Sequence, residues 1–190
     1  MNNTVTGKYK NKILTLPNIL SILRVCLIPI IVWLYVDVEN YAMAGVIVII
    51  SGITDILDGI IARRFNMTSN LGKVLDPIAD KATQIVVSLL LIVRFPMMIF
   101  PLLLGIIKET FMASSGYMIV KRRGIVLGAC WHGKMATVTL TLTMILHLIW
   151  HNITAPISTV SITISSIFIF LSLILYIKRN LSYLTKKQRV

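Results

Sequence analysis

Long apolar runs, separated by short polar or basic segments, follow one another along almost the whole chain. Six of these runs are long enough, at roughly 17 to 25 residues each, to cross the hydrocarbon core of a bilayer as an α-helix. The predicted spans cover residues 16–35, 41–63, 71–93, 97–120, 134–150 and 157–177. The pattern therefore predicts an all-α integral membrane protein with six transmembrane helices.

The composition agrees with this prediction, since 56% of the 190 residues are hydrophobic and only 14% are charged. Lys and Arg outnumber Asp and Glu by 19 to 7, which gives a formal net charge of +12. Such a basic balance is also found in nucleic-acid-binding proteins, but here the basic residues lie mostly at the ends of apolar runs, where they suit anionic lipid headgroups. We therefore expect the lipid bilayer, and no nucleic acid, as a partner.

The basic residues also predict the orientation in the membrane. The N-terminal segment 1–15, the second and fourth connections and the tail 178–190 hold nearly all the Lys and Arg outside the spans, whereas the opposite connections hold only Arg94 beside two acidic residues. By the positive-inside rule both termini are cytoplasmic, as an even number of spans requires. We expect one multi-pass domain of the cytoplasmic membrane over residues 1–190, with five spans plus a re-entrant segment as the alternative.

Acidic side chains inside the second and third spans are the main departure from the apolar pattern. Asp55 and Asp58 are three residues apart and Asp76 and Asp80 are four apart, so on helices each pair lies on one face. Two such pairs near the same membrane face would form a cup of four carboxylates, which needs cations to stay ionised. Oxygen ligands suit hard divalent ions, so we predict a metal site. Arg24, inside the first span, should likewise face the protein interior or a polar cavity.

The aspartates belong to a longer pattern of fixed positions. It consists of Asp55, Asp58, Gly59, Ala62, Arg63, Gly72, Asp76 and Asp80. At all eight positions this pattern resembles the signature of the CDP-alcohol phosphotransferase family. The segments LPNILSILR at residues 16–24 and WHGKMATV at residues 131–138 are similar to segments of bacterial members that synthesise phospholipids, and the second is similar to that of phosphatidylglycerophosphate synthases.

The resemblance implies a membrane enzyme whose six helices surround a polar cavity open to the cytoplasm. Such an enzyme transfers the phosphatidyl group of CDP-diacylglycerol to a small alcohol, releases CMP, uses two Mg²⁺ or Mn²⁺ ions and is commonly a homodimer. The implied metal ligands are Asp55, Asp58, Asp76 and Asp80, and Asp80 is also the implied catalytic base on the acceptor hydroxyl. The implied CDP-binding residues are Asp58, Gly59, Ala62, Arg63, Gly72 and Asp76.

Cationic residues are the candidates for binding a phosphorylated acceptor. They are Lys108, Lys134, Arg122 and Arg123, with Lys121 beside them. Lys134 lies in the WHGKMATV segment, and Lys108 with Glu109 occupies the place where phosphatidylglycerophosphate synthases tend to carry Arg-Glu. A further Arg that those enzymes usually carry beyond this pair is absent from this chain, where Gly116 stands near its place. We favour glycerol 3-phosphate as the acceptor, and a CDP-dependent cardiolipin synthase or an enzyme acting on serine or inositol phosphate remains an alternative.

A divalent-cation transporter is the alternative of a different class, because it too would carry aspartates inside its spans. Transport favours charges deep in the membrane and a repeated half, whereas these aspartates cluster near one predicted membrane face. The histidines His132, His147 and His151 have no spacing typical of a zinc site or a catalytic base, and we expect them to have structural roles.

Overall fold

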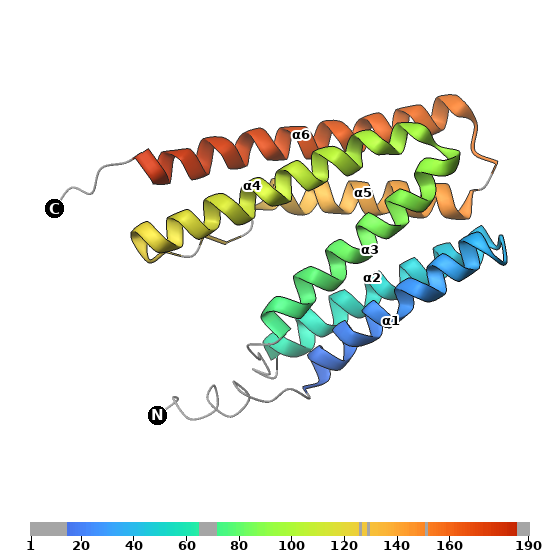
Figure 1. The fold of residues 1–190 in the computed structure, drawn as a ribbon, viewed down its shortest axis with the longest axis horizontal. Helices are drawn as coiled ribbons and strands as arrows, with labels where there is room; N and C mark the ends of the chain where they lie inside the picture. Colours follow the sequence, from blue (N-terminus) through green and yellow to red (C-terminus); the bar gives the residue numbers. More distant parts are fainter. Residues whose placement is uncertain (1–14, 65–71, 126, 129, 151, 186–190) are drawn as a thin grey trace. The chain divides into compact units, whose positions relative to one another are not determined.

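The structure, a computed structural model, describes residues 15–64, 72–125, 127–128, 130–150 and 152–185. These residues form six α-helices and one short 3-10 helix (Figure 1). In chain order they are α1 (Leu16–Val36), α2 (Tyr41–Arg64), α3 (Gly72–Arg94), η1 (Pro96–Met98), α4 (Ile99–Arg123), α5 (Trp131–Ile149) and α6 (Ala155–Thr185). The all-α prediction is confirmed for the part of the chain that the structure describes.

Four helical stretches are long and apolar enough to cross a membrane. They are Leu16–Val36, Tyr41–Ala62, Pro96–Arg123 and Ala155–Thr185. Among the described helices, α3 and α5 are not apolar enough to be counted with these four. In α3, residues 72–81 carry four charged side chains, and α5 carries a lysine, two histidines and four threonines. The chain is therefore a multi-pass membrane protein in which two helices are more polar than the rest.

The chain divides into two compact units, of which the first comprises residues 1–91 and 145–151. In this unit α1 packs against α2 along its length (Figure 1). Gly45 on α2 is buried against the last turn of α5, where a Cβ atom at its position would lie 2.9 Å from Cγ1 of Ile149. The missing side chain therefore allows these two helices to approach closely.

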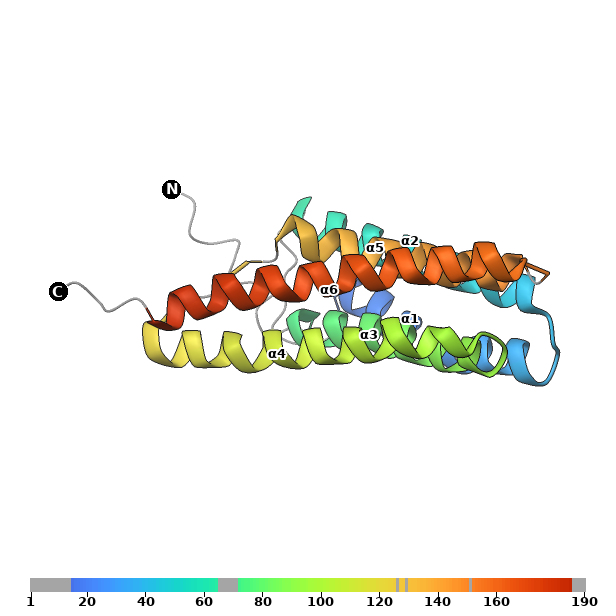
Figure 2. The ribbon, with the colours of Figure 1, turned by 90° about the horizontal axis from the view of Figure 1, so that it is seen from above.

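The second unit comprises residues 92–144 and 152–190. Here α4 and α6 run side by side, as both views show (Figures 1 and 2). Ser158, Ser165 and Ser172 lie on the buried face of α6 and are seven residues apart, so small side chains recur every two turns along this face. Small residues at such positions let helix backbones approach in a membrane protein.

The helix α6 extends to Thr185, well beyond the end of the predicted span at residue 177. Asn180 explains the extension, because its side chain is buried and its Nδ2 donates a hydrogen bond of 2.7 Å to Oγ of Ser115 on α4. The first residues of the predicted basic tail, 178–185, are therefore about two further turns of α6. At the end of α4, Gly124 adopts a left-handed conformation with φ of 65° and closes the helix; glycine adopts this conformation easily because it has no Cβ atom.

Candidate functional site

The two carboxylates of α2 lie one helical turn apart in the first unit. Asp58 is almost fully buried, with 4% of its side chain exposed, whereas the side chain of Asp55 is 41% exposed. The three-residue spacing places both on the same side of the helix. The pair thus runs from the protein interior toward its accessible surface.

The second pair lies in the first turns of α3, which begins at the buried Gly72. Asp76 and Asp80 are both half-buried, and the side chain of Asp80 is 34% exposed. Their four-residue spacing again places both on one face of the helix. The start of α3 therefore presents two carboxylates where its sequence is most polar.

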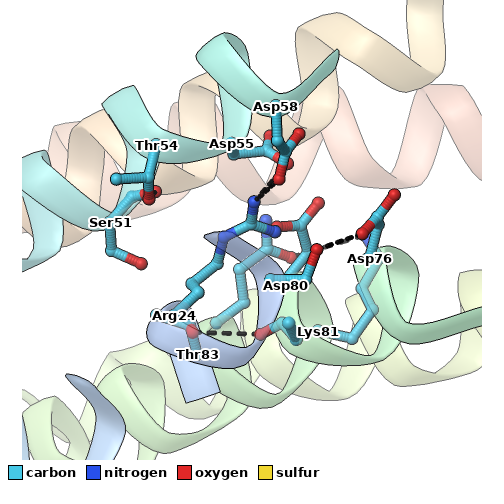
Figure 3. A network of polar contacts seen from close by, with 12 residues as sticks. Arg24, Ser51, Thr54, Asp55, Asp58, Asp76, Asp80, Lys81 and Thr83 are labelled. Atoms are coloured by element: carbon cyan, nitrogen blue, oxygen red, sulfur yellow. Dashed lines mark hydrogen bonds and ion pairs between the residues drawn. The ribbon is translucent and has the colours of Figure 1, made fainter. Parts of the chain in front are cut away.

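Arg24 of α1 joins the two pairs. Its Nη2 lies 3.0 Å from Oδ1 of Asp55 and 2.5 Å from Oδ2 of Asp58, and its Nη1 donates to Oδ1 of Asp80. Figure 3 shows the guanidinium group between the carboxylates of α2 and Asp80 of α3. The predicted inward orientation of Arg24 is confirmed, since only 2% of its side chain is exposed. A single buried cation thus contacts three carboxylates from two helices.

The fourth carboxylate also accepts a hydrogen bond from α1, because the hydroxyl of Ser21 donates to Oδ1 of Asp76. Asn18, Ser21 and Arg24 are all buried polar residues of α1, three residues apart. This recurrence inside an apolar span is the sequence signal for a polar face on α1, of which only Arg24 was predicted to face inward. Side chains on one face of α1 therefore contact all four aspartates.

The small residues of the eight-position pattern lie on the same two helices. Gly59 and Ala62 are half-buried on α2, and Gly72 is buried at the start of α3. The side chain of Arg63 lies outside the described part of the structure. The roles in binding CDP that the family resemblance implies for these four residues remain predictions.

The candidate acceptor residues belong to the second unit. Lys108 is buried on α4, and its Nζ lies 3.0 Å from Oε1 of Glu109. Lys134 is exposed in the first turn of α5, and Arg122 is exposed at the end of α4, next to the half-buried Arg123. Glu109, whose side chain is about a third exposed, thus compensates the charge of the buried Lys108.

A further group of polar contacts in the second unit was not predicted. The backbone N–H of Cys130 donates a 3.0 Å hydrogen bond to the hydroxyl of Tyr176, and Nδ1 of His132 lies 3.1 Å from Oγ of Ser172. Arg179 lies over the ring of Tyr176, with its Cζ 4.9 Å from the ring centre. Burial, together with the nearby charges of Arg179 and Lys108, lowers the pKa of His132 below its ordinary value.

The donor set of the first unit suits divalent cations. All four candidate ligands are carboxylates, whose oxygen atoms are the ligands that Mg²⁺ and Mn²⁺ prefer. Three of them already converge on one guanidinium group, and its single positive charge leaves an excess of negative charge. In the described part of the chain no three His, Cys, Asp or Glu residues form a ready-made metal cage. The residues therefore fit the predicted ions in kind and number, with Arg24 at the centre of their present arrangement.

Comparison with known proteins identifies the family. Residues 14–179 match the model of the CDP-alcohol phosphatidyltransferases. The chain belongs to this family. Its members are enzymes that transfer phosphatidyl groups, so the resemblance drawn from the eight-position pattern is confirmed.

Three relatives illustrate the range of the family. The CDP-diacylglycerol–glycerol-3-phosphate 3-phosphatidyltransferase of Aquifex aeolicus is 33% identical over 137 residues, which cover 70% of the chain and 74% of that protein. The protein of the same name from Rickettsia typhi is 35% identical over 50% of the chain and 54% of its own length. The CMP-forming cardiolipin synthase of Streptomyces coelicolor is 41% identical over 76 residues, or 37% of the chain and 35% of that protein. The chain thus matches only about a third to a half of the last two proteins.

Proposed function

We propose that the chain transfers the phosphatidyl group of CDP-diacylglycerol to a small alcohol and releases CMP, as a step of phospholipid synthesis. The observation that carries the proposal is the set of four aspartates on α2 and α3, all in contact with one face of α1. Membership of the CDP-alcohol phosphatidyltransferase family and the names of the relatives support the reaction class.

In this proposal Asp55, Asp58, Asp76 and Asp80 hold two divalent cations, Mg²⁺ or Mn²⁺. Such ions neutralise a diphosphate and stabilise the negative charge that builds up on a phosphate leaving group. Asp80 also accepts the proton of the acceptor hydroxyl as that oxygen forms its bond to phosphorus. A third of its side chain is exposed, so it is accessible to an acceptor, whereas the buried Asp58 suits a purely ligating role.

The nucleotide end of the substrate is proposed to lie along the same two helices. Gly59 and Ala62 on α2 and Gly72 on α3 lack side-chain bulk, which would let CDP approach the backbone beside Asp58 and Asp76. Arg63 is proposed to contact the diphosphate, because a guanidinium group binds phosphate oxygens in a bidentate manner.

Glycerol 3-phosphate is the acceptor that we favour, since two relatives carry it in their names. The proposed contacts for its phosphate are Lys108, Lys134, Arg122 and Arg123. Lys108 and Lys134 lie in segments similar to those of phosphatidylglycerophosphate synthases, whereas Arg122 and Arg123 are proposed for their charge alone and have a role as a topology signal as the alternative. The second candidate is a cardiolipin synthase, which the Streptomyces coelicolor relative favours by its higher identity over a shorter stretch. Serine and inositol phosphate rank below these two.

We further propose the arrangement in the membrane. All six α-helices cross or enter the bilayer as one family domain, around a polar cavity open to the cytoplasm. Both termini lie on the cytoplasmic side of the cell membrane, and two copies of the chain form a homodimer. The support for the orientation is the distribution of Lys and Arg among the connections, which follows the positive-inside rule.

The reaction is tested with purified protein in detergent, by measuring CMP release from CDP-diacylglycerol with glycerol 3-phosphate, phosphatidylglycerol, serine and inositol phosphate in turn. We expect release with glycerol 3-phosphate, complete dependence on Mg²⁺ or Mn²⁺, and loss of release in Asp76→Asn. Asp37→Asn is the matched control, because Asp37 is an exposed carboxylate at the end of α1. It should retain full activity.

Two results would contradict the proposal. Full activity of Asp76→Asn would remove this residue from the metal site. Absence of CMP release with every acceptor, together with uptake of Mn²⁺ by proteoliposomes that contain the protein, would favour a divalent-cation transporter instead. Release with phosphatidylglycerol alone would keep the reaction class and assign the cardiolipin synthase activity.

A further inference from the structure

We propose that Arg24 is a built-in competitor for divalent cations at the aspartate site. In this view its guanidinium group neutralises the carboxylates when no metal is bound and must leave at least one of them when metal binds. Arg24 would thereby lower the metal affinity of the site and keep it folded at low metal concentration. The inference rests on the proposed metal-dependent function and assigns a role to a residue outside the aspartate pattern.

Arg24 contacts three of the four aspartates. Its two terminal nitrogens contact Asp55, Asp58 and Asp80, so it bridges α2 and α3 as a metal ion held by these residues would. A planar guanidinium group with several N–H donors can contact three carboxylates at once, whereas the ammonium group of lysine is a point charge. Arg24 is thus placed and shaped to act as a common counter-ion (Figure 3).

A divalent cation bound by these aspartates would be repelled by the positive charge of Arg24. The carboxylate oxygens in contact with Arg24 belong to three of the four proposed metal ligands. A divalent cation at those oxygens would lie within a few ångströms of the guanidinium charge, and two such like charges in a buried site repel strongly. Both cations therefore cannot keep all of these contacts at the same time.

The deep burial of Arg24 limits where its charge can go. Arg24 cannot move its charge into water without cost, because it is among the most deeply buried large side chains of the described residues. Its Nε is also buried and has no hydrogen-bond partner among the residues that the structure describes, so the present contacts do not satisfy the whole guanidinium group. The contacts of Arg24 therefore hold the aspartates in place, but they leave one guanidinium N–H without a partner in the described part of the chain, so a divalent cation can displace the guanidinium group from a carboxylate.

The test is a titration of the full chain in detergent with Mn²⁺, after removal of metal by a chelator, with free Mn²⁺ measured by electron paramagnetic resonance. Arg24→Gln should bind Mn²⁺ about tenfold more tightly than the wild type, because the competitor is gone. Its melting temperature without metal should be lower than that of the wild type, and added Mn²⁺ should raise it by more. Arg179→Gln removes an arginine of the second unit and should leave the Mn²⁺ affinity unchanged.

An Arg24→Gln variant that binds Mn²⁺ as weakly as the wild type, or more weakly, would overturn the role of Arg24 and leave the metal site itself intact. A wild type that binds no Mn²⁺ would overturn both the metal site and the competition. Arg24→Lys keeps the proposal testable if Arg24→Gln does not fold. Lysine is shorter than arginine and lacks the planar fork of the guanidinium group, so it should hold the three carboxylates less firmly. This variant should therefore bind Mn²⁺ about threefold more tightly than the wild type, and equal affinity would again overturn the proposal.

Discussion

In the first unit the polar side chains around α1 are mostly charged, with Arg24 in contact with three aspartates and Ser21 in contact with the fourth. In the second unit the buried polar contacts are mostly neutral, such as Asn180 with Ser115 and Tyr176 with the backbone of Cys130. Both groups lie in helices of a membrane protein, where polar groups need partners. They differ in the charge that remains after pairing.

This difference separates function from packing. The neutral contacts of the second unit pair donors with acceptors on neighbouring segments and so stabilise the approach of α4, α5 and α6. The carboxylates of the first unit outnumber the one arginine that they share, which is expensive in a membrane and is not needed for helix packing. We therefore expect substitutions in the first unit to affect activity first and substitutions in the second unit to affect stability first.

The largest effect is expected for Asp58→Asn. The amide keeps the shape of the carboxylate but removes its charge, so CMP release should fall by more than about 100-fold while the protein stays folded. Ser115→Ala is the contrasting variant in the second unit. It removes the acceptor of Asn180 and should lower the free energy of unfolding by about 1–2 kcal/mol without loss of CMP release. Retained activity in Asp58→Asn, or lost activity in a folded Ser115→Ala protein, would break the distinction between the two units.

The next effect concerns the packing of α5 on α6. A Cβ atom at Gly133 would collide with the hydroxyl of Tyr176 and lie 3.0 Å from its ring atoms Cε2 and Cζ. Because Tyr176 is fully buried, Gly133→Ala should shift this side chain, disturb its hydrogen bond with Cys130 and destabilise the protein by about 1–3 kcal/mol. Thermal unfolding in detergent measures this change.

Gly105→Ala is the matched control, because Gly105 lies inside α4 of the same unit and a Cβ atom there would have no neighbour within 4 Å. Alanine favours a helix over glycine by up to about 1 kcal/mol, so this variant should melt at the same or a higher temperature than the wild type. A Gly133→Ala protein that is as stable as Gly105→Ala would show that Tyr176 does not require the glycine.

The helices and the aspartate pairs could be predicted from the sequence because each depends on local spacing. Apolar runs of sufficient length locate the spans, and intervals of three and four residues place each pair of aspartates on one helix face. The predicted bounds of α1 to α4 accordingly agree with the structure within a few residues. Such patterns do not depend on which helices become neighbours.

The partners of these residues depend on tertiary packing and could not be predicted in the same way. The sequence indicates that Arg24 points inward, but its contact with Asp58 and Asp80 follows from the packing of α1 against other helices. Likewise, the basic residues after position 177 suggest an exposed tail, whereas Asn180 finds a buried partner on α4 and keeps the helix intact. The spacing of Asn18, Ser21 and Arg24 was the available sign of a polar face on α1.

The smallest effect that we expect is a dependence of the stability of the second unit on pH, through His132. His132 contacts the neutral side chains of Ser172 and Tyr176 and lies near the charges of Lys108 and Arg179. Because burial and these charges lower its pKa, the unfolded chain takes up the proton first as the pH falls below the ordinary value of 6.5. The contribution of His132 to stability is thus complete above that pH and is lost below it.

We therefore expect the melting temperature of the wild type to fall more than that of His132→Asn between about pH 7.5 and about pH 5.5, by on the order of 1 °C. Asparagine retains a hydrogen-bonding group beside Ser172 but does not titrate, so the difference between the two proteins isolates the imidazole from the aspartates of the first unit. The same comparison of CMP release should show no difference in pH dependence, because His132 is assigned to packing. If the melting temperatures of both proteins depend equally on pH, the positive charge of His132 is tolerated beside Lys108 and Arg179. The second unit would then be less sensitive to added charge than its neutral contacts imply.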